Sequence, residues 1–269
     1  MTEQLAVAMA FERRAFEAGV DMPEPVMPRD PILGWVARIE DRLFRVYRWV
    51  EHAGTQPDVL GWLGRTMLQV HQLQPVGVGL PRWWRDAVQP PATWEGWFAE
   101  ARSRGASWAG LGADTLPHIL AANARISSWC EVAPDLVTTH GDVKPHNVVI
   151  SPAGPVLVDW DSVRTDSAAL EAARVAYIFG SGHARQIQRI LTAYAAAGGN
   201  LTWPGPDLFL SVTRNHLQTL ADHIRTALGE TPTAHWMGDA AAIEAIITNK
   251  LRTLPTQLDE LRRLAVAVV

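Results

Sequence analysis

Apolar and polar positions divide the chain into a short first part that mixes helix and strand and a longer part that is mainly helical. Residues 3–18 have helical periodicity, and Gly19 is a suitable residue to end that helix. Two runs within residues 35–50, WVARIE and LFRVYRWV, are β-branched and aromatic and are separated by a short polar turn. This pattern predicts a hairpin, and the proline-rich stretch before it must be extended.

After residue 54 the apolar spacing is helical almost to the end of the chain. Residues 75–115 contain proline, glycine and several tryptophans, which predicts helix fragments joined by loops. The segments that we predict as longer helices are 59–73, 118–130, 169–179, 184–197, 208–228 and 241–254.

One segment interrupts the helical part. In residues 148–158 two β-branched runs flank Ser-Pro-Ala-Gly-Pro, which predicts a second short hairpin. Asn147 precedes the first strand of this hairpin and Asp159 follows the second. Because a hairpin returns to its origin, we expect these two side chains to lie close together.

Composition is that of an ordinary globular protein and excludes several classes. The chain has 269 residues, of which 48% are hydrophobic and 19% charged, and its net charge of -4 gives no basic footprint for nucleic acid or an anionic membrane. No run approaches the roughly 18 apolar residues that a membrane span needs. LAVAMAF, near the start, is followed at once by charged residues and favours an amphipathic helix over a signal peptide. The single cysteine, Cys130, cannot form an intrachain disulfide, so we expect a cytoplasmic protein.

The polar loop THGDVKPHNVVI, residues 139–150, carries the candidate chemistry. Asp142 and Asn147, together with Asp159 beyond the hairpin, form a set of oxygen ligands. Such a set suits a hard cation, and few protein ligands suit magnesium that is held partly by substrate phosphates. The order also matches the kinase catalytic loop H-R-D-x-x-x-x-N, which a metal-binding Asp follows after a short hairpin.

HGDVKPHN followed by VDWD resembles the aminoglycoside phosphotransferase family, including its choline-kinase-like relatives. These are small-molecule kinases with a protein-kinase-like fold. Glycine after the histidine and DWD in place of DFG both favour this branch over protein kinases. The resemblance implies an α+β, two-lobe fold. Residues 1–51 would be the remnant of the nucleotide-binding lobe, reduced to a helix and a hairpin, and residues 52–269 a large, mainly helical lobe with the catalytic loop and the acceptor site.

The resemblance also implies roles for single residues. Asp142 would accept the proton of the acceptor hydroxyl, and Lys144 would neutralise the γ-phosphate. Asn147 and Asp159 would bind Mg²⁺, which bridges the phosphates of ATP or GTP.

Other roles follow from the same resemblance. His140 would fix the loop by hydrogen bonds. Asp161 would orient Lys144 or approach the metal, or else be a solvated or capping residue. FRVYRWVE resembles the strand and hinge that contact the nucleotide. The candidate nucleotide-binding residues are Arg48, Trp49, Val50 and Glu51.

The chain departs from the family where a phosphate-binding lysine is expected. Its two lysines are Lys144 and Lys250, neither of which fits that role, and the sequence has no GxxxxGK[ST] loop. Either Glu3 or Glu12 on the first helix would then be the partner of an absent lysine. Two interpretations compete: the chain is truncated before Met1, or it is a reduced, weakly active or inactive member of the family.

The sequence therefore predicts a phosphotransferase that moves the γ-phosphate of ATP or GTP to a hydroxyl of a small molecule. We expect an antibiotic as acceptor, aminoglycoside-like or otherwise cationic, which would make the enzyme an agent of antibiotic resistance. The alternative is a weak or inactive kinase-like protein that binds a small molecule. A tryptophan cluster before the loop either forms an aromatic wall for the acceptor or packs in the helical lobe. Its members are Trp83, Trp84, Trp94, Trp97 and Trp108.

Overall fold

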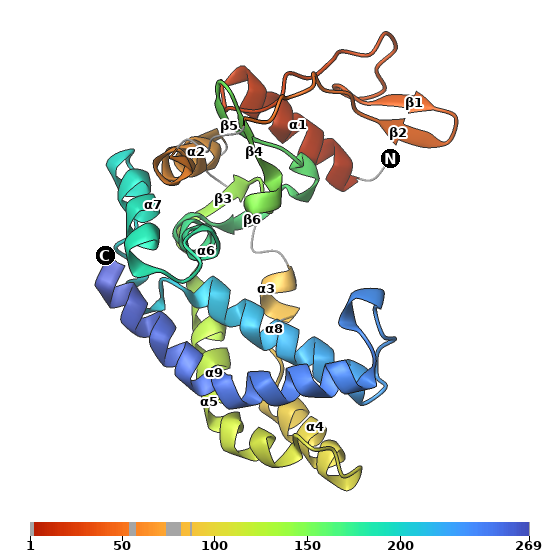
Figure 1. Ribbon diagram of the computed structural model, residues 1–269, viewed down its shortest axis with the longest axis vertical. Helices are drawn as coiled ribbons and strands as arrows, with labels where there is room; N and C mark the ends of the chain where they lie inside the picture. The colour runs from red at the N-terminus through yellow and green to blue at the C-terminus, as the bar shows by residue number, and fades with distance from the viewer. Residues whose placement is uncertain (1–2, 54–57, 74–81, 87, 269) are drawn as a thin grey trace. The chain divides into compact units, whose positions relative to one another are not determined.

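The computed structural model describes residues 3–53, 58–73, 82–86 and 88–268 of the chain. These residues form short strand pairs and many helices, and the chain divides into two compact units (Figure 1). The first unit comprises Met1–Leu80, Pro134–Pro204 and Val268–Val269, and the second comprises Pro81–Ala133 and Gly205–Ala267. The predicted lobe boundary at residue 52 is a different division and stays a prediction.

The first unit opens with helix α1 (Glu3–Glu17), as the periodicity predicts, and Gly19 follows it with a positive φ of 74°. The predicted hairpin is present but shorter than expected, because β1 (Ala37–Ile39) and β2 (Arg42–Phe44) pair over three residues each.

The chain after Phe44 leaves β1 for another partner. The backbone amide of Val26 donates to the carbonyl of Val46 at 2.8 Å, and the amide of Arg48 donates to Glu24 at 2.8 Å. The proline-rich segment is therefore extended, as predicted, and it takes the backbone hydrogen bonds that a longer hairpin would have used.

The second predicted hairpin is confirmed. Strands β4 (Val148–Ser151) and β5 (Gly154–Leu157) are antiparallel, with Val148 opposite Leu157. A further pair, β3 (Leu136–Thr139) and β6 (Arg164–Ser167), was not predicted from the sequence. This pair encloses the hairpin in sequence.

Two short 3₁₀ helices join these strands. The polar loop and η1 (Pro145–Asn147) connect β3 to β4, and η2 (Trp160–Ser162) connects β5 to β6. The chain thus places the loop and η2 between the same two strand pairs.

Three helices complete the first unit: α2 (Val59–Leu73), α6 (Ala168–Phe179) and α7 (Ala184–Ala196). They pack on one another, and α2 also contacts β3. Glycine at position 64 permits the close approach of α2 to α7, since a Cβ there would lie 2.3 Å from the carbonyl oxygen of Ile190.

The second unit is helical in its described residues. Its longer helices are α4 (Pro91–Ser103), α5 (Ala109–Val132), α8 (Leu210–Ala227) and α9 (Ala240–Val268), which ends in the first unit. Shorter elements are α3 (Arg82–Asp86), η3 (Gly205–Asp207) and η4 (His235–Met237).

Two predicted helix limits at prolines were wrong. Helix α5 begins nine residues before the predicted start and includes Pro117, and α9 continues through Pro255 to Val268. Proline removes one backbone donor, but the hydrogen bonds of the neighbouring turns carry both helices through it.

Most of the tryptophan cluster packs in the core of the second unit. Trp84, Trp94 and Trp108 are fully buried, and Trp97 is nearly so. Trp83 is partly exposed, and the guanidinium carbon of Arg214 lies 4.0 Å from its ring centroid. Packing is thus the role of the buried tryptophans.

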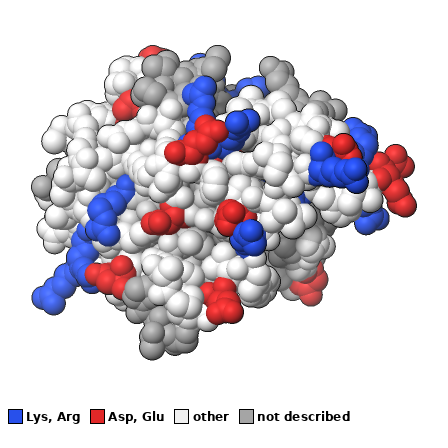
Figure 2. Space-filling view, turned by 90° about the horizontal axis from the view of Figure 1, so that it is seen from above, with Lys and Arg blue, Asp and Glu red and all other residues white. Residues whose placement is uncertain are grey.

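Two surface properties agree with the composition. In the described part of the chain, every helix is too short or too polar to cross a membrane. The face drawn in Figure 2 mixes acidic and basic side chains.

Candidate functional site

The polar loop is held against η2 by a glycine. Gly141 has a φ of +82°, and a Cβ at this position would lie 2.1 Å from the carbonyl oxygen of Ser162. Any other residue would therefore be strained and would push the loop away from η2. The pattern HGD, instead of the HRD of protein kinases, thus has a local steric reason in this fold.

His140 is fully buried and fixes the loop through both ring nitrogens. Its Nδ1 accepts a hydrogen bond from the backbone amide of Asp142 at 3.3 Å, so Nε2 carries the proton and donates to the carbonyl of Val158 at 3.0 Å. Burial lowers the pKa of His140 below its ordinary value, which favours this neutral form. The geometry is that of the structural residue expected from the sequence.

Three predicted residues meet in the loop. Lys144 Nζ donates to Asp142 Oδ2 at 2.7 Å, and Asn147 Nδ2 donates to the same oxygen at 3.0 Å and to the backbone carbonyl of Asp142 at 2.8 Å. The carboxylate of Asp142 is 30% exposed. It is therefore oriented by two donors and still open to solvent on one side.

Asn147 and Asp159 lie at the same end of the β4–β5 hairpin, as the sequence predicts. The amide of Val158, next to Asp159, donates to the carbonyl of Asn147 at 2.9 Å. Because the amide nitrogen of Asn147 points towards Asp142, its amide oxygen is turned away. Asp159 is an exposed non-glycine residue with left-handed backbone angles (φ 68°, ψ 63°), a conformation that is often found at functional sites.

Asn147 and Asp159 suit a magnesium site that is completed by water and substrate phosphates better than a metal site made of protein ligands alone. Within residues 3–53, 58–73, 82–86 and 88–268, no cluster of three or more His, Cys, Asp and Glu side chains could hold a metal ion. Magnesium typically takes one or two protein carboxylates and completes its shell with water and substrate phosphates. Asn147 and Asp159 match that requirement.

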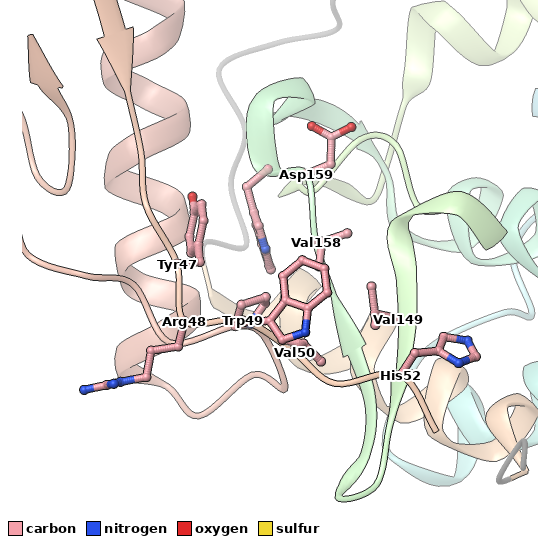
Figure 3. A pocket seen from close by; sticks show the side chains of 10 residues that line it. Tyr47, Arg48, Trp49, Val50, His52, Val149, Val158 and Asp159 are labelled. Carbon is pink, nitrogen blue, oxygen red and sulfur yellow. The ribbon is translucent and has the colours of Figure 1, made fainter. Parts of the chain in front are cut away.

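A cavity of about 480 Å³ lies between the segment that follows β2 and the β4–β5 hairpin (Figure 3). Trp49 and Val50 line it from one side, and Val149 and Val158 line it from the hairpin. Asp159 stands at one end of the cavity, so the predicted metal ligand and an apolar cavity share one site (Figure 3).

Three of the four predicted nucleotide-binding residues line this cavity. Arg48, Trp49 and Val50 line it, although the guanidinium of Arg48 points away from it in Figure 3 and pairs with Glu24 at 2.8 Å. Glu51 is exposed and is not among the described lining residues. Tyr47, which the sequence did not single out, also lines the cavity.

A charged network beside the cavity was missed as well. Glu12, on α1, is fully buried and accepts hydrogen bonds from Arg45 Nη1 at 2.9 Å and from the hydroxyl of Tyr47. Arg45 Nη2 also pairs with Asp161 in η2, while Lys144 pairs with Asp142. The side chain of Glu3, the other acid considered, lies outside the described residues. Arg45 and Tyr47 alternate along one extended segment, and this period of two could have placed them on one face.

Burial and charge act in opposite directions in this network. Burial raises the pKa of Glu12 above its ordinary value, although the hydrogen bond from Tyr47 and the charge of Arg45 lower it. For Arg45, burial lowers the pKa, but the attraction of Glu12 and Asp161 outweighs burial and leaves the pKa above its ordinary value. Arg45 thus stays a cation.

A family model described as the phosphotransferase enzyme family matches residues 3–209. No curated protein matches the sequence.

Solved structures share the fold. An aminoglycoside phosphotransferase from Alicyclobacillus acidocaldarius is 14% identical, with a TM-score of 0.59, and the match covers 98% of this chain and 82% of that chain. A choline/ethanolamine kinase family protein from Mesorhizobium loti is 15% identical, with a TM-score of 0.56 and coverages of 97% and 84%. An amicoumacin kinase in complex with AMP-PNP and Ca²⁺ is 10% identical, with a TM-score of 0.62 and coverages of 95% and 78%. The predicted kinase-like α+β fold, with a reduced β-lobe, is therefore confirmed.

Proposed function

The chain belongs to the phosphotransferase enzyme family, and we propose that it transfers the γ-phosphate of ATP or GTP to a hydroxyl group of a small molecule. One observation carries the proposal. Asp142 is oriented by Lys144 and Asn147, and Asp159 stands one hairpin away at the end of an apolar cavity. Phosphoryl transfer needs little covalent chemistry from the protein, so catalysis rests on positioning and on charge.

In this proposal Asp142 accepts the proton of the acceptor hydroxyl and aligns its oxygen. Lys144, whose Nζ lies 2.7 Å from Asp142 Oδ2, would turn to the γ-phosphate when the nucleotide binds. Its side chain is 42% exposed, so this movement needs no repacking of the core.

Asn147 and Asp159 would hold Mg²⁺. When bound, the ion neutralises charge on the transferred phosphoryl group. The two residues fit this role because they offer oxygen donors from one end of a rigid hairpin and leave other positions to phosphates and water.

The nucleotide base would bind in the cavity. Its walls include the apolar side chains of Val50, Val149 and Val158 and the indole of Trp49, which are suited to a flat aromatic ring. Its volume of about 480 Å³ falls within the usual range of ligand sites. Residues 1–51 would then supply one wall, in line with their proposed origin in a nucleotide-binding lobe.

For the acceptor we propose a cationic antibiotic or a related amine. Relatives of the same fold include an aminoglycoside phosphotransferase and an amicoumacin kinase, and the net charge of -4 does not oppose a cation. The acceptor would bind to residues within 52–269.

The test combines phosphotransfer with one exchange in the loop. Mg·ATP and Mg·GTP are offered with aminoglycosides, amicoumacin and choline, and phosphorylated product is measured by mass spectrometry. Asp142→Ala should lower kcat by about 10²–10⁴-fold, whereas Asp30→Ala, at an exposed acid of the same unit, should not change it.

Two results would contradict the proposal. Normal turnover by Asp142→Ala would remove the catalytic role of the loop. A wild-type protein that melts at the same temperature with and without Mg·ATP or Mg·GTP, and forms no product, would favour the alternative of a kinase-like binding protein.

A further inference from the structure

The starting point is a carboxylate that the protein buries at some cost. Glu12 is 0% exposed and lies on the face of α1 that also buries Ala8, Phe11 and Ala15. An ionised carboxylate in such surroundings needs a cation and hydrogen bonds. Arg45 and Tyr47 supply them.

Arg45 uses its two terminal nitrogens for two different elements. Nη1 binds Glu12 on α1, and Nη2 binds Asp161 in η2. The Arg45 side chain is 18% exposed, while that of Asp161 is 60% exposed. The guanidinium therefore links a buried acid to the surface turn that directly follows Asp159.

A second contact joins the same two elements. The buried ring of Trp160, between Asp159 and Asp161, lies 6.2 Å from the ring of Phe11 on α1 and 4.7 Å from the ring of His140. Apolar packing thus sets the distance between α1 and η2. The charged link through Arg45 can fix their orientation.

In protein kinases, an ion pair between a lysine and a helix glutamate must be in place together with the metal-binding aspartate. The cation that Glu12 binds is an arginine.

We propose that Arg45 is a positioning residue: by binding Glu12 and Asp161 at once, it fixes the turn that presents Asp159 to the Mg·nucleotide. The proposal rests on the proposed function. It also explains why arginine suits the position. A guanidinium offers separate nitrogens in a planar fork, whereas an ammonium is a single point charge.

The test separates positioning from folding by a conservative exchange. Arg45→Lys retains a cation for Glu12 but cannot span to Asp161, and Asp161→Asn removes the negative charge at the other end of the link. Arg13→Ala is the matched control. Arg13 lies on α1, next to Glu12, and forms an exposed ion pair with Glu17 of the same helix.

Two quantities are measured. The first is amide hydrogen exchange over residues 159–163 in the protein without nucleotide, and the second is the Kd for Mg·ATP by calorimetry. Arg45→Lys and Asp161→Asn should each raise exchange in this segment and weaken Mg·ATP binding by about 10–100-fold, the usual range for residues that orient metal ligands. The double variant should bind Mg·ATP no more weakly than either single variant, because the two exchanges break the same link. Arg13→Ala should match the wild type in both measurements.

Unchanged exchange in Arg45→Lys and Asp161→Asn would overturn the link itself. Faster exchange with unchanged Mg·ATP affinity would overturn its role in positioning. Additive losses in the double variant would also overturn it, since the two residues would then act separately. A wild-type protein that binds neither Mg·ATP nor Mg·GTP would refute the proposed function. The nucleotide role of Arg45 would fall with it, while the exchange data would still decide whether the link exists.

Discussion

Glu12 and Glu171 are both fully buried acids of the first unit, yet their pKa values move in opposite directions. For Glu171, burial raises the pKa, but the hydrogen bond from His71 and the charge of Arg174 outweigh it and lower the pKa to about 2. For Glu12, burial raises the pKa and the groups around it do not offset this fully.

The surroundings explain the difference. Glu171 accepts from His71 Nε2 at 3.1 Å and from Arg174 Nη2 at 2.9 Å, and both partners are themselves buried. Glu12 has Arg45, whose charge is shared with the exposed Asp161. A cation that belongs to one acid stabilises that acid fully, while a shared cation couples it to another element. The first network holds helices together, and the second connects a helix to the candidate site.

The largest effect should come from removing Glu171. Its network with His71 and Arg174 is sealed, in that all three side chains are buried. Glu171→Ala leaves Arg174 and His71 buried without their anion and should reduce the free energy of unfolding by about 3–5 kcal/mol. Glu12→Ala should cost less, because Arg45 keeps Asp161 and some contact with water. Urea denaturation of both variants measures the two losses. A greater loss for Glu12→Ala would refute the distinction between a sealed and a shared network.

The helices and the second hairpin could be predicted from the sequence because their signals are local. Apolar residues at helical spacing predicted α1 and α2 within a residue or so, and turn residues predicted β4–β5. The pair β3–β6 was missed because its two strands are separated by a long intervening segment, so no turn signal joins them. The predicted strands of the first hairpin were too long because competition from the proline-rich segment is not visible in the runs themselves.

The candidate site divides in the same way. Asp142, Asn147 and Asp159 are close in the sequence, and a predicted hairpin joins Asn147 to Asp159. Their proximity could therefore be predicted. The link through Arg45 joins residues 33 and 116 positions apart. No periodicity carries that information, and only the packing of α1 on η2 brings these charges together.

The contributions of Glu171 and Glu12 to stability should change with pH in opposite directions. A pKa of about 2 in the folded protein, against the ordinary 4.5, means that the contribution of Glu171 is present above pH 4.5 and is lost as the pH falls towards 2. The raised pKa of Glu12 has the opposite sign: its contribution is present below pH 4.5 and is lost as the pH rises through the pKa of the folded state.

Glu171→Gln should therefore flatten the acid side of the stability curve, and Glu12→Gln should flatten the decline above pH 4.5. Thermal unfolding between pH 3 and 8 follows both variants against the wild type. The same change of slope in both variants would mean that the two acids do not differ in the way described.

The smallest effect should come from replacing Tyr47 or Tyr194, each of which contacts one of the two networks through its hydroxyl. The Tyr47 hydroxyl donates to Glu12, and the Tyr194 hydroxyl lies 3.0 Å from Nδ1 of His71 in the other network. Replacing either residue by phenylalanine removes one hydrogen bond and should cost about 1 kcal/mol of stability. Only Tyr47→Phe should also weaken Mg·ATP binding, by a few-fold, because Tyr47 lines the cavity and holds the acid that Arg45 links to η2. Calorimetric titration of both variants with Mg·ATP tests this, and an equal loss of affinity in Tyr194→Phe would show that the two networks act on the site through stability alone.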